Sequence, residues 1–147
     1  MPFGALGLGM GLSRPVVASG ASPFPGPDII SGAGSFASTT GWTLLGGGSI
    51  SGGQFNTDGS GTGRTNRTAA VTIVAGTYRA TFDIVATDGA SPVTVSVGGA
   101  TQSPPGSTSP GSCSVDIASA AASQIVQINA GSGTIASIDN FVVKQIA

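Results

Sequence analysis

Hydrophobic and polar residues alternate along most of the chain. The clearest stretch is 77–86, where apolar residues occupy every second position from Tyr78 onward. A repeat of two residues is that of an extended strand with one buried face. Similar stretches, separated by turns rich in Gly and Pro, are 42–45, 49–55, 68–74, 93–97, 113–117, 124–129 and 134–146. The pattern predicts roughly eight short strands, and therefore an all-β fold, an antiparallel β-sandwich or jelly roll.

Three segments between these stretches lack the alternation. The run of alanines within 119–123 predicts a single helical turn, because alanine is the best helix former. The Pro- and Ser-rich segment 103–111 predicts an exposed loop, and so does the Gly-rich segment 58–68.

The first 27 residues follow a different pattern. Leucine or methionine alternates with glycine or alanine over 5–12, and three prolines follow within 22–27. A helix would cost about 1 kcal/mol for each interior glycine, whereas an extended strand accepts this alternation. Two interpretations stay open: a mobile tail, or an anchor that docks into a groove or sheet edge of another protein through Leu6, Leu8, Met10 and Leu12. We therefore divide the chain into an extended N-terminal anchoring arm with a Pro-rich linker, 1–27, and a sandwich domain, 28–147.

Composition restricts the chemistry. The chain has five basic and six acidic residues, a net charge of −1 and no histidine, and its acidic residues are all aspartates. Scattered basic residues argue against nucleic acid as a partner. Without histidine, Ser-His-Asp and Cys-His catalysis and His/Cys zinc sites are excluded. The single cysteine, Cys113, is predicted to be a small core residue, and no motif brings two aspartates together. We expect a protein that is not an enzyme.

The apolar segment 1–12 raises the question of a membrane or secretion signal. It has no basic residue before it and is far shorter than the roughly 20 residues that span a bilayer. We expect no membrane partner.

Three parts of the domain resemble a known family. They are Ser35-Phe36 with Gly41-Trp42 and 50–55 at the start, 71–84 in the middle, and 136–144 at the end. In this order they resemble carbohydrate-binding-module-like jelly rolls of the galactose-binding type, which are often found in bacteriophage virion proteins. The closing stretch is the most specific part, and the resemblance covers roughly residues 29–147, that is, most of the chain.

The resemblance also bears on metal binding. In that family, an opening acidic residue and a closing aspartate often hold a structural calcium ion. Here Ser35 stands where the acid would be, and Asp139 matches the closing aspartate. Because calcium favours several carboxylates, we expect no cofactor and consider Asp139 at most a weak calcium ligand. The alternative is an inward-facing Asp139 satisfied by backbone N–H groups or by hydroxyl groups.

Two functions follow from the resemblance and the arm. The first is a non-enzymatic virion structural protein, a capsid decoration, head-fibre or tail-associated subunit assembled in the host cytoplasm. Its arm would attach to other virion proteins and to copies of itself in a homo-oligomer. The alternative is a carbohydrate-binding module for adhesion to surface glycans. Its glycan or interface contacts would include Arg64, Asn66, Arg67 and Trp42, although Trp42 also fits a core position.

Overall fold

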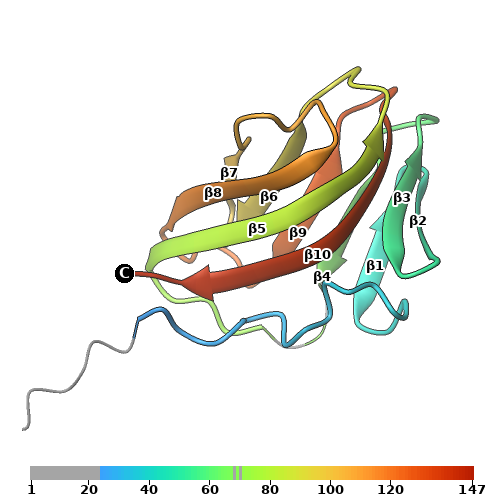
Figure 1. The fold of residues 1–147 in the computed structure, drawn as a ribbon. Helices are drawn as coiled ribbons and strands as arrows, with labels where there is room; N and C mark the ends of the chain where they lie inside the picture. The colour runs from blue at the N-terminus through green and yellow to red at the C-terminus, as the bar shows by residue number, and fades with distance from the viewer. Residues whose placement is uncertain (1–23, 68, 70) are drawn as a thin grey trace, which may run out of the picture.

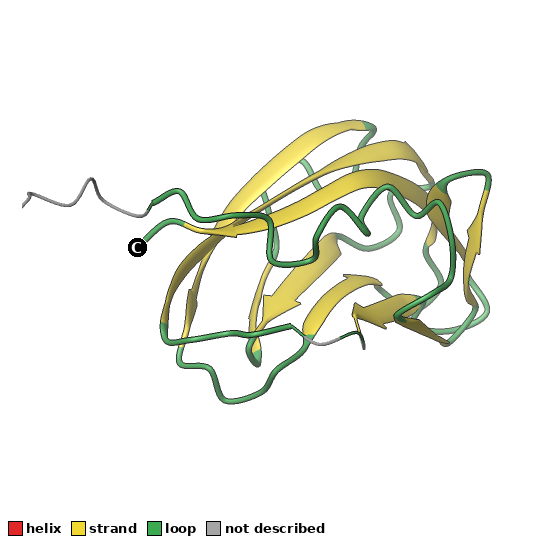
Figure 2. Ribbon diagram, turned by 90° about the horizontal axis from the view of Figure 1, so that it is seen from below, coloured by secondary structure: helices red, strands yellow, loops and turns green. Residues whose placement is uncertain are grey.

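The computed structural model describes residues 24–147 except Thr68 and Ala70. These residues form two five-stranded antiparallel sheets, ordered β1-β4-β9-β6-β7 and β2-β3-β10-β5-β8, and contain no helix. The sheets face each other in two layers (Figures 1 and 2). The strands are β1 (Trp42–Leu45), β2 (Gly48–Ser51), β3 (Gln54–Asp58), β4 (Arg64–Arg67), β5 (Gly76–Thr87), β6 (Val93–Val97), β7 (Ala100–Gln102), β8 (Gly111–Ser119), β9 (Val126–Ala130) and β10 (Ile135–Gln145). The predicted all-β antiparallel sandwich is confirmed.

The strand pairs show how the chain is wound. β6 pairs with β7, and outward from this hairpin β5 pairs with β8, β4 with β9 and β3 with β10. This nested order is that of one long hairpin rolled across two sheets, which is the jelly-roll arrangement. β1 and β2 add one edge strand to each sheet.

Aromatic side chains fill much of the space between the sheets. Phe36, Phe55, Phe82 and Phe141 are at most 2% exposed. The Trp42 ring lies 5.3 Å from the Phe36 ring and 6.4 Å from the Phe141 ring, measured between centroids. In β5 every second residue from Tyr78 to Ile84 points inward, as the alternation predicted, whereas Ala86, expected on the same face, is exposed because the register with β10 shifts before it. In β10 the alternation is interrupted once, between Ile138 and Phe141.

Cys113 is a core residue, as predicted. Its side chain is free and only 5% exposed. Burial, with a smaller contribution from the negative charge of Asp83, raises the pKa of its thiol. The thiol is therefore held in its protonated, poorly nucleophilic form.

The segment that precedes β1 lies beside the C-terminal half of β10. Gly26 donates its N–H to the Gln145 carbonyl oxygen (2.8 Å), and Phe141 donates its N–H to that of Gly34 (3.0 Å). β3 pairs only with 135–138 of β10, so this segment occupies the edge that β3 leaves open. The described chain thus begins at the end of the sandwich where the C-terminus lies (Figure 1).

The prediction of a strand over 68–74 is wrong for the residues of this range that the structure describes, because 71–74 belong to no strand. Val71 and Ile73 are nevertheless buried. Ile73 donates its N–H to Gln124 Oε1 (2.7 Å), and Gln124 Nε2 donates to the Ile73 carbonyl oxygen (2.9 Å). A side-chain amide thus takes the place of a strand partner, which a hydrophobic pattern does not detect.

Other predicted elements also need correction. The helical turn over 119–123 is absent, since Ser119 ends β8 and Ala121 has a φ of 55°, outside the right-handed helical region. The predicted loop 58–68 contains β4. The single strand predicted over 49–55 is a hairpin of β2 and β3. In the part of the chain that the structure describes, no helix is long and apolar enough to cross a membrane.

Candidate functional site

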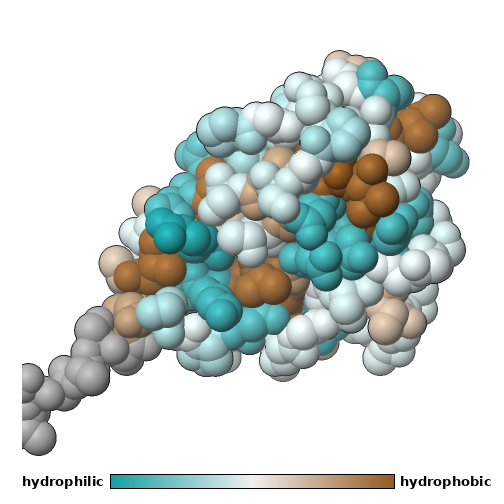
Figure 3. Space-filling view, in the orientation of Figure 1, coloured by the Kyte–Doolittle hydropathy of each residue, from teal (hydrophilic) through white to brown (hydrophobic). Residues whose placement is uncertain are grey.

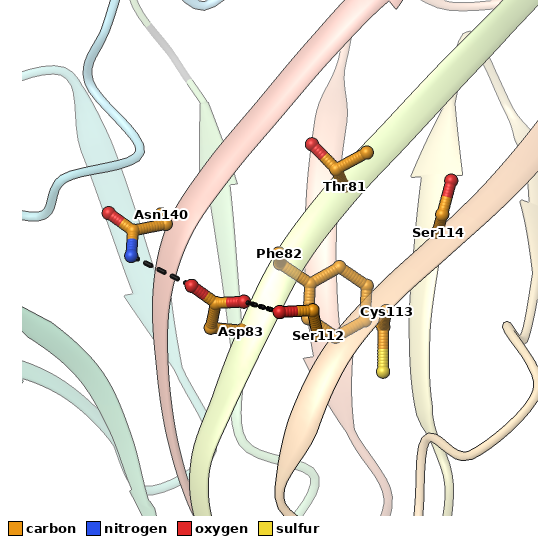
Figure 4. A pocket seen from close by; sticks show the side chains of 7 residues that line it. All are labelled: Thr81, Phe82, Asp83, Ser112, Cys113, Ser114 and Asn140. Carbon is orange, nitrogen blue, oxygen red and sulfur yellow. Dashed lines mark hydrogen bonds between the residues drawn. The ribbon is translucent and has the colours of Figure 1, made fainter.

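A depression of about 320 Å³ lies on the outer face of β5, β8 and β10. The Asp83 carboxylate lies between the side chains of Asn140 and Ser112, and the hydroxyl groups of Thr81 and Ser114 line the depression farther along β5 and β8 (Figure 4). Ser112 Oγ donates to Asp83 Oδ1 (2.5 Å), and Asn140 Nδ2 donates to Asp83 Oδ2 (2.8 Å). Three strands thus hold one carboxylate in a fixed position.

These hydrogen bonds determine the charge of the site. The bond from Ser112, followed by that from Asn140, lowers the pKa of Asp83, against a smaller opposing effect of burial. Asp83 therefore stays ionised at neutral pH and can accept hydrogen bonds but not donate a proton. The arrangement suits contact with a polar group better than acid catalysis.

The position of Asn140 depends on an irregularity in β10. Asp139 is the register partner of Asp83 and Val142 that of Thr81, so β10 contains one residue more than β5 between these pairs. Asn140 takes up this extra length with a φ of 52°, which asparagine tolerates better than most residues. The register thus brings the neighbouring carboxylates of Asp83 and Asp139 to one face, which the sequence did not indicate.

Asp139 does not face inward, and this expectation is corrected. The side chains of Ile138 and Phe141 are buried, whereas Asp139 is half-buried and follows the alternation to the outer face. Its Oδ1 accepts the Asn140 N–H (2.7 Å), in agreement with the expected backbone partner. No group of three or more Asp or Cys side chains suited to a metal ion lies within the described residues, so calcium binding at Asp139 stays a prediction.

The acidic residue near the start of the domain that makes structural contacts is Asp28. Its Oδ1 accepts the N–H groups of Ile30 (3.2 Å) and Val143 (3.1 Å), and its Oδ2 accepts that of Gly32 (2.7 Å). Asp28 therefore fastens the segment before β1 to β10. The bond to a residue two positions later is the local pattern that could have identified it from the sequence.

Trp42 lies in the core and agrees with the core interpretation. It is 7% exposed, and its Nε1–H donates to the Ala33 carbonyl oxygen (3.3 Å). The Arg67 guanidinium lies 5.4 Å from the centroid of the Trp42 ring, and its Nη1 donates to the Thr40 carbonyl oxygen (3.1 Å). Arg67 thus packs over the ring, which leaves little of it free to stack on a sugar.

Arg64 and Asn66 lie on β4 rather than in a loop, and they alternate with the fully buried Thr65. They therefore lie on the outer face of their sheet, on the opposite side of β4 from Arg67. Beside them, Asn129 of β9 also faces outward. The side-chain Oδ1 atoms of Asn66 and Asn129 are buried without a hydrogen-bond partner among the described residues. The four candidate contact residues thus form two groups, not one site.

The predicted anchoring residues Leu6, Leu8, Met10 and Leu12 lie outside the described residues. In comparisons with known proteins, the sequence matches no protein-family model and no curated protein.

Proposed function

We propose that this protein is a non-enzymatic structural subunit of a bacteriophage particle. Its N-terminal residues would attach it to other particle proteins or to neighbouring copies, and its jelly roll would be displayed. The observation that carries the proposal is where the described chain begins. Gly26 bonds to Gln145, and Ala147 accepts the Thr77 N–H (2.8 Å), so both ends of the described chain lie at one end of the sandwich. Attachment there leaves both outer sheet faces and the opposite loops free.

The composition of the N-terminal residues supports attachment. Leu6, Leu8, Met10 and Leu12 alternate with small residues, so an extended chain would present them along one edge. Burying a side chain of this size against a partner stabilises by about 1.5–3 kcal/mol. Four such side chains offset much of the entropy that association costs, and a net charge of −1 permits close packing of copies.

The experiment compares particle incorporation of the unaltered chain and of two full-length variants. In the first, Leu6, Leu8, Met10 and Leu12 are all replaced by serine. In the matched control, the three leucines are replaced by isoleucine and Met10 by leucine. Copies per purified particle are counted by quantitative mass spectrometry. We expect the number of copies per particle to be at least about tenfold lower for the serine variant, since a tenfold decrease corresponds to a loss of only about 1.4 kcal/mol of binding free energy. Equal incorporation of all three proteins would exclude attachment through these residues.

The alternative, carbohydrate binding, is favoured by a different observation. The outer face of β4, β9 and β6 is polar, and it contains the unpartnered carbonyl oxygens of Asn66 and Asn129. Both oxygens are buried in the chain without ligand, so a sugar would have to turn these side chains outward before its hydroxyl groups could donate to them. A glycan array should then give hits that an Asn66→Ala, Asn129→Ala double variant loses and an Asn56→Ala control on the opposite sheet keeps. The absence of hits with the unaltered chain would rule this alternative out.

A further inference from the structure

The edge strands of the two sheets differ in length. β1 and β2 have 4 residues each and β7 has 3, whereas β8 has 9. Proteins protect sheet edges with short strands, Pro, Lys or bulges, because an exposed edge pairs readily with another chain. β8 contains neither Pro nor Lys, and its register with β5 is continuous from Gly111 to Ser119. β8 is therefore a long and unprotected edge.

The hydrogen-bond pattern shows which backbone groups of β8 point outward. Thr77 of β5 exchanges backbone hydrogen bonds with Ile146 and Ala147, so its polar groups are directed away from β8. Since this direction alternates along a strand, the even-numbered residues of β5 bond to β8, and their partners there are the odd-numbered residues. The residues directed to the free edge are Ser112, Ser114, Asp116 and Ala118. Within the described part of the chain, no other segment bonds to their backbone groups.

We propose that two copies of this chain pair through β8 in antiparallel orientation, about a twofold axis at Val115. In this register Ser112 faces Ala118 of the second copy, and Ser114 faces Asp116 of the second copy. All four outward-directed residues then find a partner, which gives about eight hydrogen bonds between the copies. The sheet β2-β3-β10-β5-β8 of one copy and the same sheet of the second copy then become one continuous sheet.

The side chains of β8 agree with this register. A shift that moved the axis to Asp116 would place two carboxylates opposite each other, which is unfavourable. With the axis at Val115, each Asp116 stays bound to Arg79 of its own chain (2.7 Å). On the inner face, the half-buried Val115 meets its counterpart, and Cys113 meets Ile117 of the second copy, so that the apolar layer continues across the junction.

The outer face of the same sheet supports pairing at the edge rather than on the face. Hydrophilic residues separate its hydrophobic patches (Figure 3), so no large apolar surface requires cover there. The twofold axis places the first described residues and the C-termini of the two copies at opposite ends of the dimer, so a dimer would present two sites of attachment. The pairing itself does not depend on the proposed function, because it uses no residue of the N-terminal segment 1–27.

The test measures the mass of the full-length protein by light scattering during size-exclusion chromatography at micromolar concentrations. We expect twice the chain mass of 14.1 kDa. Ser114→Pro removes one outward N–H without touching the bonds to β5, as edge strands permit. It should raise the dimer dissociation constant at least about tenfold, whereas Ser114→Ala should leave the constant unchanged. A monomeric unaltered chain, or a dimer that Ser114→Pro does not weaken, would overturn the proposal.

A cross-link tests the register even if the proline variant unfolds. In a Cys113→Ala background, Val115→Cys places two thiols in directly opposite positions that are not hydrogen-bonded, where the Cα atoms lie about 4.5 Å apart. Mild oxidation should give a covalent dimer. Thr101→Cys on the β7 edge, in the same background, is the control and should not cross-link. Equal yields would contradict pairing through β8. Both tests repeated on the full-length variant in which Leu6, Leu8, Met10 and Leu12 are replaced by serine separate this proposal from attachment, since the dimer should persist when particle incorporation is lost.

Discussion

The two sheets differ in how their outer faces are stabilised. On the face of β5, β8 and β10, Arg79 binds both carboxylate oxygens of Asp116 at 2.7 and 2.8 Å, and Asp83 accepts two side-chain hydrogen bonds. On the face of β4 and β9, the side-chain oxygens of Asn66 and Asn129 have no partner among the described residues. The first face thus satisfies these polar groups internally, whereas the second buries two acceptors that no described residue satisfies.

The test with the largest expected effect removes the Asp28 carboxylate, which joins the segment before β1 to β10 of the first sheet. Asp28→Ala leaves the N–H groups of Ile30, Gly32 and Val143 without their acceptor. We expect the free energy of unfolding to fall by about 2 kcal/mol, as for other partly buried donors that lose a partner. Urea denaturation measures the change.

The control for this variant is Asp58→Ala at the exposed end of β3, which removes a carboxylate that accepts only from the next turn, from the Ser60 N–H (2.9 Å) and the Ser60 hydroxyl group. The decrease in the free energy of unfolding should be clearly smaller for this control than for Asp28→Ala. Equal losses for the two variants would mean that Asp28 is no more than an ordinary turn residue.

A second test uses pH. The pKa values of Asp83 and Asp116 are lowered in the folded protein, chiefly by the hydrogen bonds from Ser112 and from Arg79. The unfolded chain therefore binds more protons in acid, and the stability that these groups contribute above the unfolded pKa is lost as pH falls through the folded value. We expect the melting temperature to decrease between about pH 5 and pH 2.

Asp83→Asn should flatten this decrease, because the variant has one carboxylate fewer with a lowered pKa. The melting temperature against pH, measured for both proteins in parallel, shows the difference in slope. Identical slopes would mean that the bonds around Asp83 do not favour its charged form.

The smallest expected effect concerns the second sheet. Asn66→Thr removes an unpartnered oxygen and introduces a residue that favours strands, so we expect stability to stay within about 0.5 kcal/mol or to rise slightly. Asn56 on β3 is the matched control, because its amide accepts from Ser137 (2.7 Å) and donates to Ser51. Asn56→Thr should cost about 1 kcal/mol in thermal unfolding. If Asn66→Thr lowers the stability as much as Asn56→Thr does, the polar side chains of the second face are hydrogen-bonded as well as those of the first.

The sequence predicted best those strands that bury one face over most of their length. β5 was expected over 77–86 and spans Gly76–Thr87, because apolar residues occupy every second position. β4 was missed because its inward residues are Thr65 and Arg67, which carry no hydrophobic signal. The opposite error occurred at 71–74, where an apolar pattern correctly indicated burial but not hydrogen bonding.

The candidate site was less predictable than the fold. Asp83, Ser112 and Asn140 lie far apart in the sequence, and they meet through the register of three strands and one extra residue in β10. No local pattern encodes that register. The Asp28 contact to Ile30 is local and could have been anticipated, whereas its contact to Val143 could not.

The pairing of the first described residues with β10 has a mechanical consequence. This segment runs antiparallel to β10, with bridges from Asp28 to Lys144 and from Gly34 to Phe141. A tensile load applied at Phe24 and resisted at the far end of the sandwich would act along the strand axis. The hydrogen bonds would then bear it together in shear instead of breaking one after another, so the segment resists a pull along β10 better than a force that peels it away from β10.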